Sequence, residues 1–133
     1  MSGEKGLVEL LRKAGYSDKA IDYYMRKLNV GMIEGAEAVD SYTGLCGDSM
    51  RVYLKVEEGV IRDAKFQAIG CAGAFASGSA LTEMVKGKTL KEAGKMTEHD
   101  VVNDLKELPG PKLHCARLAV DALRKSIESY VER

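Results

Sequence analysis

Three cysteines are the residues of this sequence with the most specific chemistry. Cys46 lies in a glycine-flanked segment, Cys71 stands where a predicted strand leads into a predicted helix, and Cys115 opens the last predicted helix. Soft metals and sulfur-transfer chemistry require thiolates, and the amide groups of a helix N-terminus favour the thiolate form at Cys71 and Cys115. No Cys-x-x-Cys pair is present, so neither a disulfide framework nor a structural zinc finger is expected. The set indicates a metal or sulfur site, with buried, inert cysteines as the alternative.

Two other residues, Asp48 and His114, stand beside these cysteines in the sequence. Asp48 follows Cys46 by two positions, and His114 immediately precedes Cys115. Either could add an oxygen or nitrogen ligand, or could serve only at a strand start or a helix cap. Consecutive side chains on a helix do not face each other, so we expect no catalytic Cys–His dyad. His99 lies in a predicted capping segment without a nearby cysteine, which predicts a surface residue.

Length and charge bound the class of protein. The chain has 133 residues, 45% of them hydrophobic, and its 20 basic and 20 acidic residues give a formal charge of zero. This composition predicts one soluble globular domain that does not recruit nucleic acid through its net charge. The acidic start and the lack of a long apolar stretch predict a cytoplasmic chain without a leader or membrane span.

Apolar spacing and capping residues predict several helices around a β-hairpin. Thr89 and Thr97 each begin a capping box that opens a short helix, and Ser17 can cap a longer one. The glycine-rich stretch 31–47 is predicted to be a loop. The longer helices are expected over residues 7–14, 17–28, 72–86 and 114–130.

The hairpin joins two alternating segments, residues 49–57 and 60–69. A three-residue loop would set Val52 opposite Ala64 and keep one face apolar, whereas a two-residue Glu58-Gly59 loop would set Val52 opposite Lys65. We therefore expect the first register. Extended to the open end, it places Cys46 opposite Gly70, beside Cys71.

The three cysteine motifs resemble those of the IscU and NifU N-terminal type iron–sulfur cluster assembly scaffolds. The motifs are Gly44-Leu-Cys-Gly-Asp48, Ile69-Gly-Cys71 and His114-Cys-Ala-Arg-Leu-Ala119. The resemblance runs from about Tyr16 to the C-terminus. It implies an α+β fold, with a small antiparallel sheet packed against several helices and a long C-terminal helix. It also divides the chain into a helical N-terminal extension, residues 1–15, and a scaffold domain, residues 16–133.

The same resemblance implies a scaffold, not an enzyme, on which a 2Fe–2S cluster is built and then handed to apo-proteins. It implies that Cys46, Cys71 and Cys115 hold the cluster, with Asp48 or His114 as the remaining ligand. By the same analogy Cys115 is the candidate acceptor of persulfide sulfur, and Tyr16 is an auxiliary residue for sulfur release or dimer contact.

The implied partners are a cysteine desulfurase, an electron donor such as ferredoxin, recipient apo-proteins and a second copy of the chain. Leu108-Pro-Gly-Pro-Lys112 differs from the LPPVK segment that family chaperones recognise, which weakens the expectation of chaperone partners. An open coordination position also admits zinc. The alternative function is therefore a zinc-containing carrier that accepts persulfide sulfur from a desulfurase.

Overall fold

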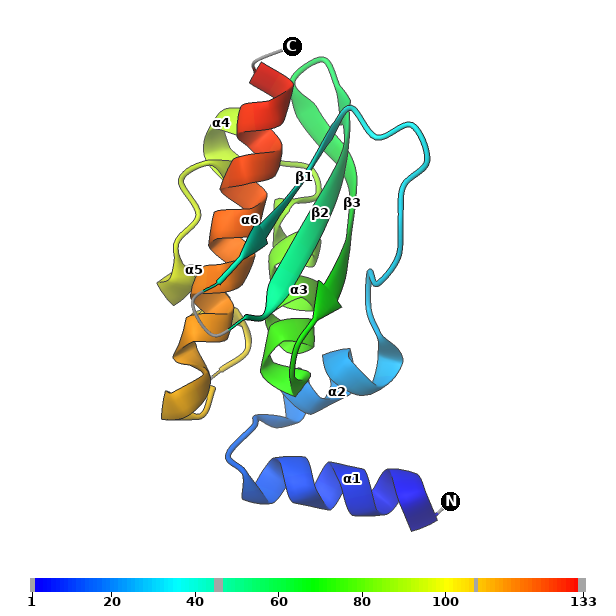
Figure 1. Ribbon diagram of the computed structural model, residues 1–133, viewed down its shortest axis with the longest axis vertical. Helices are drawn as coiled ribbons and strands as arrows, with labels where there is room; N and C mark the ends of the chain where they lie inside the picture. Colours follow the sequence, from blue (N-terminus) through cyan, green and yellow to red (C-terminus); the bar gives the residue numbers. More distant parts are fainter. Residues whose placement is uncertain (1, 45–46, 107, 132–133) are drawn as a thin grey trace.

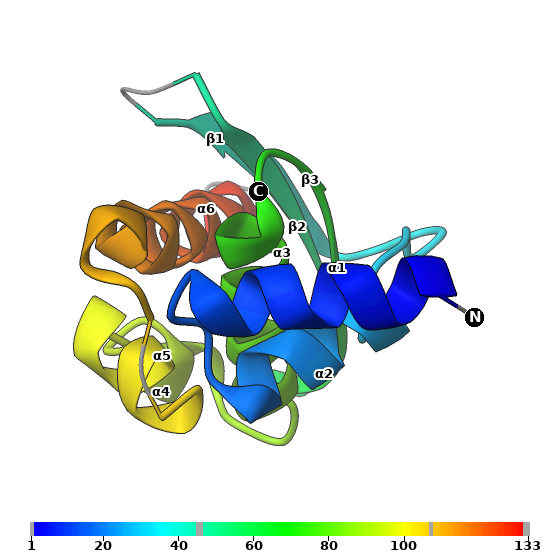
Figure 2. The same cartoon turned by 90° about the horizontal axis from the view of Figure 1, so that it is seen from below.

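Three antiparallel strands form the sheet of this computed structural model, which describes residues 2–44, 47–106 and 108–131. The strands follow the chain in the order β1-β2-β3. Two long helices pack against one face of the sheet, with α6 against β1 and β2 and α3 against β3 (Figures 1 and 2). The expected α+β fold is confirmed. These elements are β1 (Ala38–Thr43), β2 (Ser49–Glu57), β3 (Val60–Ile69), α3 (Ala72–Val85) and α6 (Leu113–Val131).

The remaining helices surround α3 and α6, away from the sheet. Helix α1 crosses one end of the molecule beside α2, as Figure 1 shows. Thr89 and Thr97 close the expected capping boxes, and Ser17 caps α2, so these predictions are confirmed. No helix in the described part of the chain has both the length and the apolar character needed to cross a bilayer. These elements are α1 (Ser2–Lys13), α2 (Asp18–Arg26), α4 (Leu90–Ala93), α5 (Glu98–Asp104) and the 3-10 turn η1 (Gly110–Lys112).

Strand β1 corrects the expectation that residues 31–47 form only a loop. It pairs with β2 along its whole length and contacts α6, where Ser129 donates a hydrogen bond to the carbonyl of Val39 over 3.3 Å. The segment Ala38–Thr43 lacks a regular apolar alternation, since only Ala38 is fully buried. Pairing with β2 and packing on α6, not local pattern, therefore make this strand.

The expected hairpin register is wrong. Glu58 and Gly59 both have positive φ, 53° and 78°, and form the two-residue loop that sets Val56 opposite Ile61. A β-bulge next to Val56 then adds one residue to β3 and shifts the pairing by one position. Because of this shift, Val52 faces Phe66, and one face of the hairpin stays apolar despite the tight turn.

Helix α3 packs very close to the sheet and completes the hydrophobic core. A Cβ placed on Gly78 would lie 2.5 Å from Cε2 of Phe66, so only glycine fits at this position. Phe66 itself is fully buried, as are Val52 and Leu54 on β2. The small residues of α3 thus fix its position on the sheet, and with it the position of the helix N-terminus that carries Cys71.

A short segment between α1 and α2 is fastened at several points. Gly15 turns the chain with φ +103°, and a Cβ there would lie 3.4 Å from Cγ of Pro109. The Ser17 hydroxyl donates a hydrogen bond to the carbonyl of Leu105. Two residues further on, Lys19 forms an ion pair with Asp104 of α5. These contacts hold Tyr16, which lies between them, against the N-termini of α3 and α6.

Candidate metal centre

The cysteine-bearing helices begin at the same end of the molecule (Figure 1). Strand β3 ends at Ile69, and Cys71 is the N-cap of α3. Cys115 lies in the first turn of α6, which the η1 turn precedes. The Sγ atoms of Cys71 and Cys115 lie 3.6 Å apart. Two thiols separated by 44 positions in the sequence therefore face one another.

Gly73 makes this approach possible. A Cβ at this position would lie 3.2 Å from Sγ of Cys115 and 3.2 Å from the phenol oxygen of Tyr16. Both contacts are tighter than an ordinary van der Waals contact of about 3.5–4.0 Å. Gly73 was not among the predicted site residues, and its position two residues after Cys71 is the signal that the sequence offers.

Asp48 and His114 place oxygen and nitrogen atoms that could bind a metal beside the Cys115 thiol. Their ligand atoms and Sγ of Cys115 all lie within 4.8 Å of one another. Nε2 of His114 is 3.7 Å from that Sγ, so the expectation that these neighbouring side chains do not meet is wrong. The exposed imidazole and the buried thiol therefore meet in the first turn of α6. Asp48 packs on Gly70, where a Cβ would lie 3.0 Å from its Oδ2.

Cys46 lies outside the described residues, and so does its predicted position opposite Gly70. The residues on either side of it are described. The amide of Gly44 donates a hydrogen bond to the carbonyl of Asp48 over 2.8 Å, and the amide of Gly47 donates one to Gly44 over 3.0 Å. A Cβ on Gly44 would lie 3.6 Å from Cδ1 of Leu118 on α6. The ends of the Cys46 segment are therefore held beside α6 and Asp48.

The two described thiols differ in their electrostatic environment. Burial raises the pKa of the Cys71 thiol, but hydrogen bonds from the Ala74 amide and the Cys115 thiol outweigh this and hold the pKa below its ordinary value. Burial raises the pKa of Cys115 to about 12, and negative charge at Cys71 adds to the effect. The expected thiolate character is thus confirmed for Cys71 and wrong for Cys115, because the side chain of Cys115 is fully buried.

Tyr16 and Lys112 complete the surroundings of the thiols. Burial raises the pKa of the Tyr16 phenol to about 12, followed in size by the charges of Cys71 and Cys115. A hydrogen-bonding interaction with the Cys71 side chain also raises the Tyr16 pKa. The Lys112 ammonium lowers the pKa of both thiols. Lys112 was predicted only as part of the 108–112 segment, because the η1 turn that brings it to the thiols has no clear sequence signal.

Residues 15–133 match the family model described as "NifU-like N terminal domain". The chain belongs to this family. Two curated relatives, each named an iron–sulfur cluster assembly scaffold protein IscU, come from Archaeoglobus fulgidus and Haemophilus influenzae. The first is 47% identical and covers 89% of this chain and 78% of the relative. The second is 43% identical and covers 86% and 94%. The resemblance drawn from the cysteine motifs is confirmed.

Solved structures give the same fold. One is described as an iron–sulfur cluster assembly scaffold protein for the SUF system from Fervidobacterium islandicum, with a TM-score of 0.69 and 27% identity. It covers 84% of this chain and 96% of the other. A NifU-like N-terminal protein from Brucella abortus has a TM-score of 0.71 at 21% identity and covers 92% of this chain and 99% of the other, which shows the fold alone.

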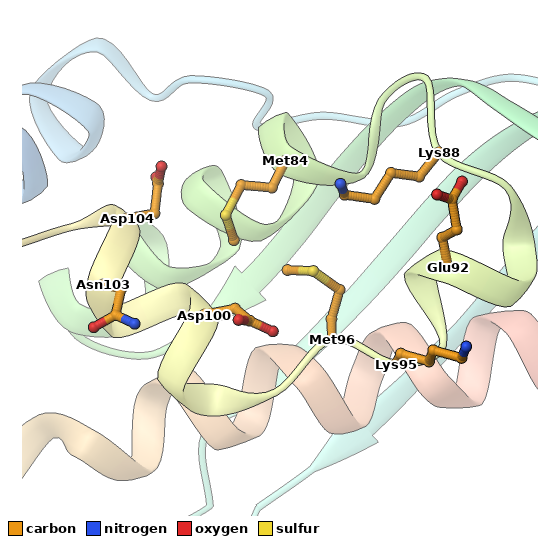
Figure 3. A pocket seen from close by; sticks show the side chains of 8 residues that line it. All are labelled: Met84, Lys88, Glu92, Lys95, Met96, Asp100, Asn103 and Asp104. Atoms are coloured by element: carbon orange, nitrogen blue, oxygen red, sulfur yellow. The ribbon is translucent and has the colours of Figure 1, made fainter.

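A cavity of about 570 Å³ lies between α3, α4 and α5 of this NifU-like chain and contains none of the predicted site residues (Figure 3). Met84 and Met96 line it together with acidic groups that already have partners. Glu92 and Asp100 close the capping boxes, and Asp104 pairs with Lys19. His99 is exposed on α5, as expected. The thiol cluster is therefore the better candidate for metal chemistry.

Proposed function

We propose that this chain is a scaffold on which an iron–sulfur cluster is assembled and from which the cluster passes to recipient proteins. The observation that carries the proposal is the convergence of two thiols, a carboxylate and an imidazole at one end of the molecule. Thiolates are the ligands that iron–sulfur clusters use, and an imidazole can replace one of them. The scaffold names of the curated relatives support the same function.

The proposed ligands of a 2Fe–2S cluster are Cys46, Cys71 and Cys115, with Asp48 or His114 in the fourth position. Three thiolates and one oxygen or nitrogen ligand suit a cluster that must later leave, because the non-thiolate ligand is a poorer match for iron in a cluster. The lowered pKa of Cys71 makes its thiolate easier to form. Cys115 must lose its proton as iron binds, so cluster loading releases a proton there.

A cysteine desulfurase is the proposed source of sulfur. The exposed side chains of Ile69 and Leu113 border the two cysteine motifs and offer an apolar surface to such a partner. Cys115 stays the candidate persulfide acceptor from the family resemblance. Because its thiol is fully buried, transfer to it requires the start of α6 to open, whereas Cys71 is already partly exposed.

Other partners follow from the same proposal. An electron donor such as ferredoxin would reduce the sulfur, and Tyr16 stands where it could assist release because its phenol contacts Cys71. A homodimer around a shared cluster remains part of the proposal. The 109–112 segment forms a turn with Pro109 packed near Gly15, so a chaperone that reads it in extended form must first displace this contact.

The alternative, a zinc-containing sulfur carrier, uses the same residues. Asp48, His114 and Cys115 could hold a single zinc ion. The names of the curated relatives favour the scaffold. A carrier would accept persulfide sulfur while zinc stayed bound, and it would form no stable cluster.

Anaerobic reconstitution tests the proposal. The metal-free protein is given iron, cysteine and a cysteine desulfurase, and visible absorption, bound iron and bound sulfide are followed. We expect equal amounts of iron and sulfide, a cluster spectrum, and transfer of the cluster to an apo-ferredoxin. Cys71→Ser should abolish the spectrum, and His99→Ala, at an exposed position outside the site, should leave it unchanged. Tight zinc with persulfide transfer and no cluster would favour the carrier instead.

A further inference from the structure

We propose that Cys71 and Cys115 form a disulfide bond when the metal-free protein meets a peroxide, which closes the metal site reversibly. Their Sγ atoms are 3.6 Å apart in the reduced protein. A disulfide has an S–S distance of about 2.05 Å. The two sulfurs therefore need to approach by about 1.5 Å, which side-chain rotation and a small backbone shift can supply.

The position of the two residues permits this movement. Cys71 is the N-cap of α3 with extended φ and ψ of −86° and 179°, so it lies outside the helix proper. Gly73 leaves the space into which Sγ of Cys115 reaches. A residue with a larger side chain at this position would hold the two sulfurs apart.

The difference in exposure assigns separate roles to the two thiols. Cys71 is partly exposed and is the thiol that a peroxide can reach. Cys115 is fully buried, with its sulfur close to Cys71, and it can react only with a group formed on that neighbour. A buried resolving thiol also limits further oxidation of Cys71, because the sulfenic acid is consumed as soon as it forms.

The reaction balances with one hydrogen peroxide per disulfide. The Cys71 thiolate attacks one peroxide oxygen, the O–O bond breaks, and hydroxide leaves to give a sulfenic acid. The Cys115 sulfur then attacks Sγ of Cys71, the S–O bond breaks, and the departing hydroxide takes the thiol proton to form water. The hydroxide from the first step takes up the proton that Cys71 released when it ionised. The two sulfurs together lose two electrons, and the peroxide is reduced to two molecules of water.

Oxidation would remove two sulfur ligands from the candidate metal centre at once. Asp48 and His114 would lose the Cys115 sulfur that lies within 4.8 Å of their ligand atoms. The oxidised protein should therefore not bind iron or zinc tightly until a dithiol reduces it. Neither iron nor a desulfurase takes part in the disulfide, so it can form whether or not the chain is a scaffold.

Mass spectrometry of the full, metal-free chain tests the proposal. The reduced protein is treated with one equivalent of hydrogen peroxide and denatured in excess N-ethylmaleimide. We expect the adduct count to fall from three to one, with a loss of two hydrogen atoms and a peptide pair linked through Cys71 and Cys115. Dithiothreitol should restore three adducts, and zinc binding should be lost and regained in parallel.

Two variants distinguish the proposed pair from other pairings. Cys46→Ser should still form the disulfide and show no adduct after oxidation. Gly73→Ala should form it more slowly, because the added Cβ contacts the Cys115 sulfur. A link to Cys46, or a sulfinic acid on Cys71 with Cys115 still open to alkylation, would overturn the proposal. Cluster assembly by the reduced protein is measured separately, so that a failed disulfide and a failed scaffold give different results.

Discussion

The N-termini of α3 and α6 each carry a cysteine, yet the two thiols differ in exposure and their pKa values shift in opposite directions. Cys71 at the N-cap of α3 is partly exposed and receives amide hydrogen bonds that lower its pKa. Cys115, inside the first turn of α6, is fully buried and its pKa is raised to about 12. A cysteine near a helix start is therefore not enough to predict a thiolate. Whether the thiol pKa is lowered or raised depends on whether the residue is the N-cap and on how exposed its side chain is.

The largest expected effect is the loss of the cluster when either thiol is removed. Cys71→Ser and Cys115→Ser should each abolish stable cluster formation. Only the second should also lower the free energy of unfolding, by about 1–3 kcal/mol, because it buries a hydroxyl at a fully buried position. Reconstitution and denaturant unfolding of the metal-free variants measure the two effects. Equal stability losses would contradict the difference in burial.

The alkylation rates of Cys71 and Cys115 measure the difference between the two thiols directly. In the metal-free protein at neutral pH, Cys71 should react with iodoacetamide at least about tenfold faster than Cys115, because its thiolate is favoured and accessible. The Cys71 rate should rise with pH, with a midpoint below the ordinary thiol pKa. The Cys115 rate should stay low until the protein unfolds. Peptide mapping over time gives both rates, and similar rates would break the comparison.

Gly73→Ala should disturb the contact between the two helix ends. The new Cβ would lie 3.2 Å from both the Cys115 sulfur and the Tyr16 phenol oxygen. We expect a loss of roughly 1–3 kcal/mol in the free energy of unfolding and slower cluster assembly. Gly6→Ala in α1, where a Cβ meets nothing within 4 Å, is the matched control. That control should be slightly stabilising, and an equal response of both variants would exclude a specific contact at Gly73.

The smallest expected effect comes from Lys112. Its ammonium lowers the pKa of both thiols, so Lys112→Ala should raise the pKa of Cys71, whereas Lys112→Arg should keep it low. The sign follows from charge: removal of a cation disfavours the thiolate. Titration of the ultraviolet absorbance of the thiolate follows the change. An unchanged Cys71 pKa in Lys112→Ala would remove Lys112 from the electrostatics of the site.

Local signals in the sequence predicted much of this arrangement. The capping boxes at Thr89 and Thr97 and the two alternating strands are encoded by neighbouring residues, and the structure contains them. The order of the cysteine motifs identified the family. These features need only short-range patterns, which is why a single sequence is enough to find them.

Features that depend on distant contacts were missed. Strand β1 forms because it pairs with β2 and packs against α6. The bulge next to Val56 shifts the strand pairing by one residue, so a tight Glu58-Gly59 turn and an apolar face occur together. A prediction that assumes one register along the whole hairpin cannot give this result. The high pKa of Cys115 and the role of Gly73 follow from how closely α6 packs against α3. That packing distance is set by tertiary structure, so residue types alone do not give it.

The most direct test of the central claim, that the two helix ends hold one cluster, is Mössbauer spectroscopy of the protein reconstituted with iron-57. We expect two iron sites in equal amounts, one with sulfur ligands only and one in which an oxygen or nitrogen ligand replaces a thiolate. Asp48→Ala and His114→Ala should then show which residue binds the second site. A single site typical of mononuclear iron, unaffected by Cys71→Ser, would contradict the account.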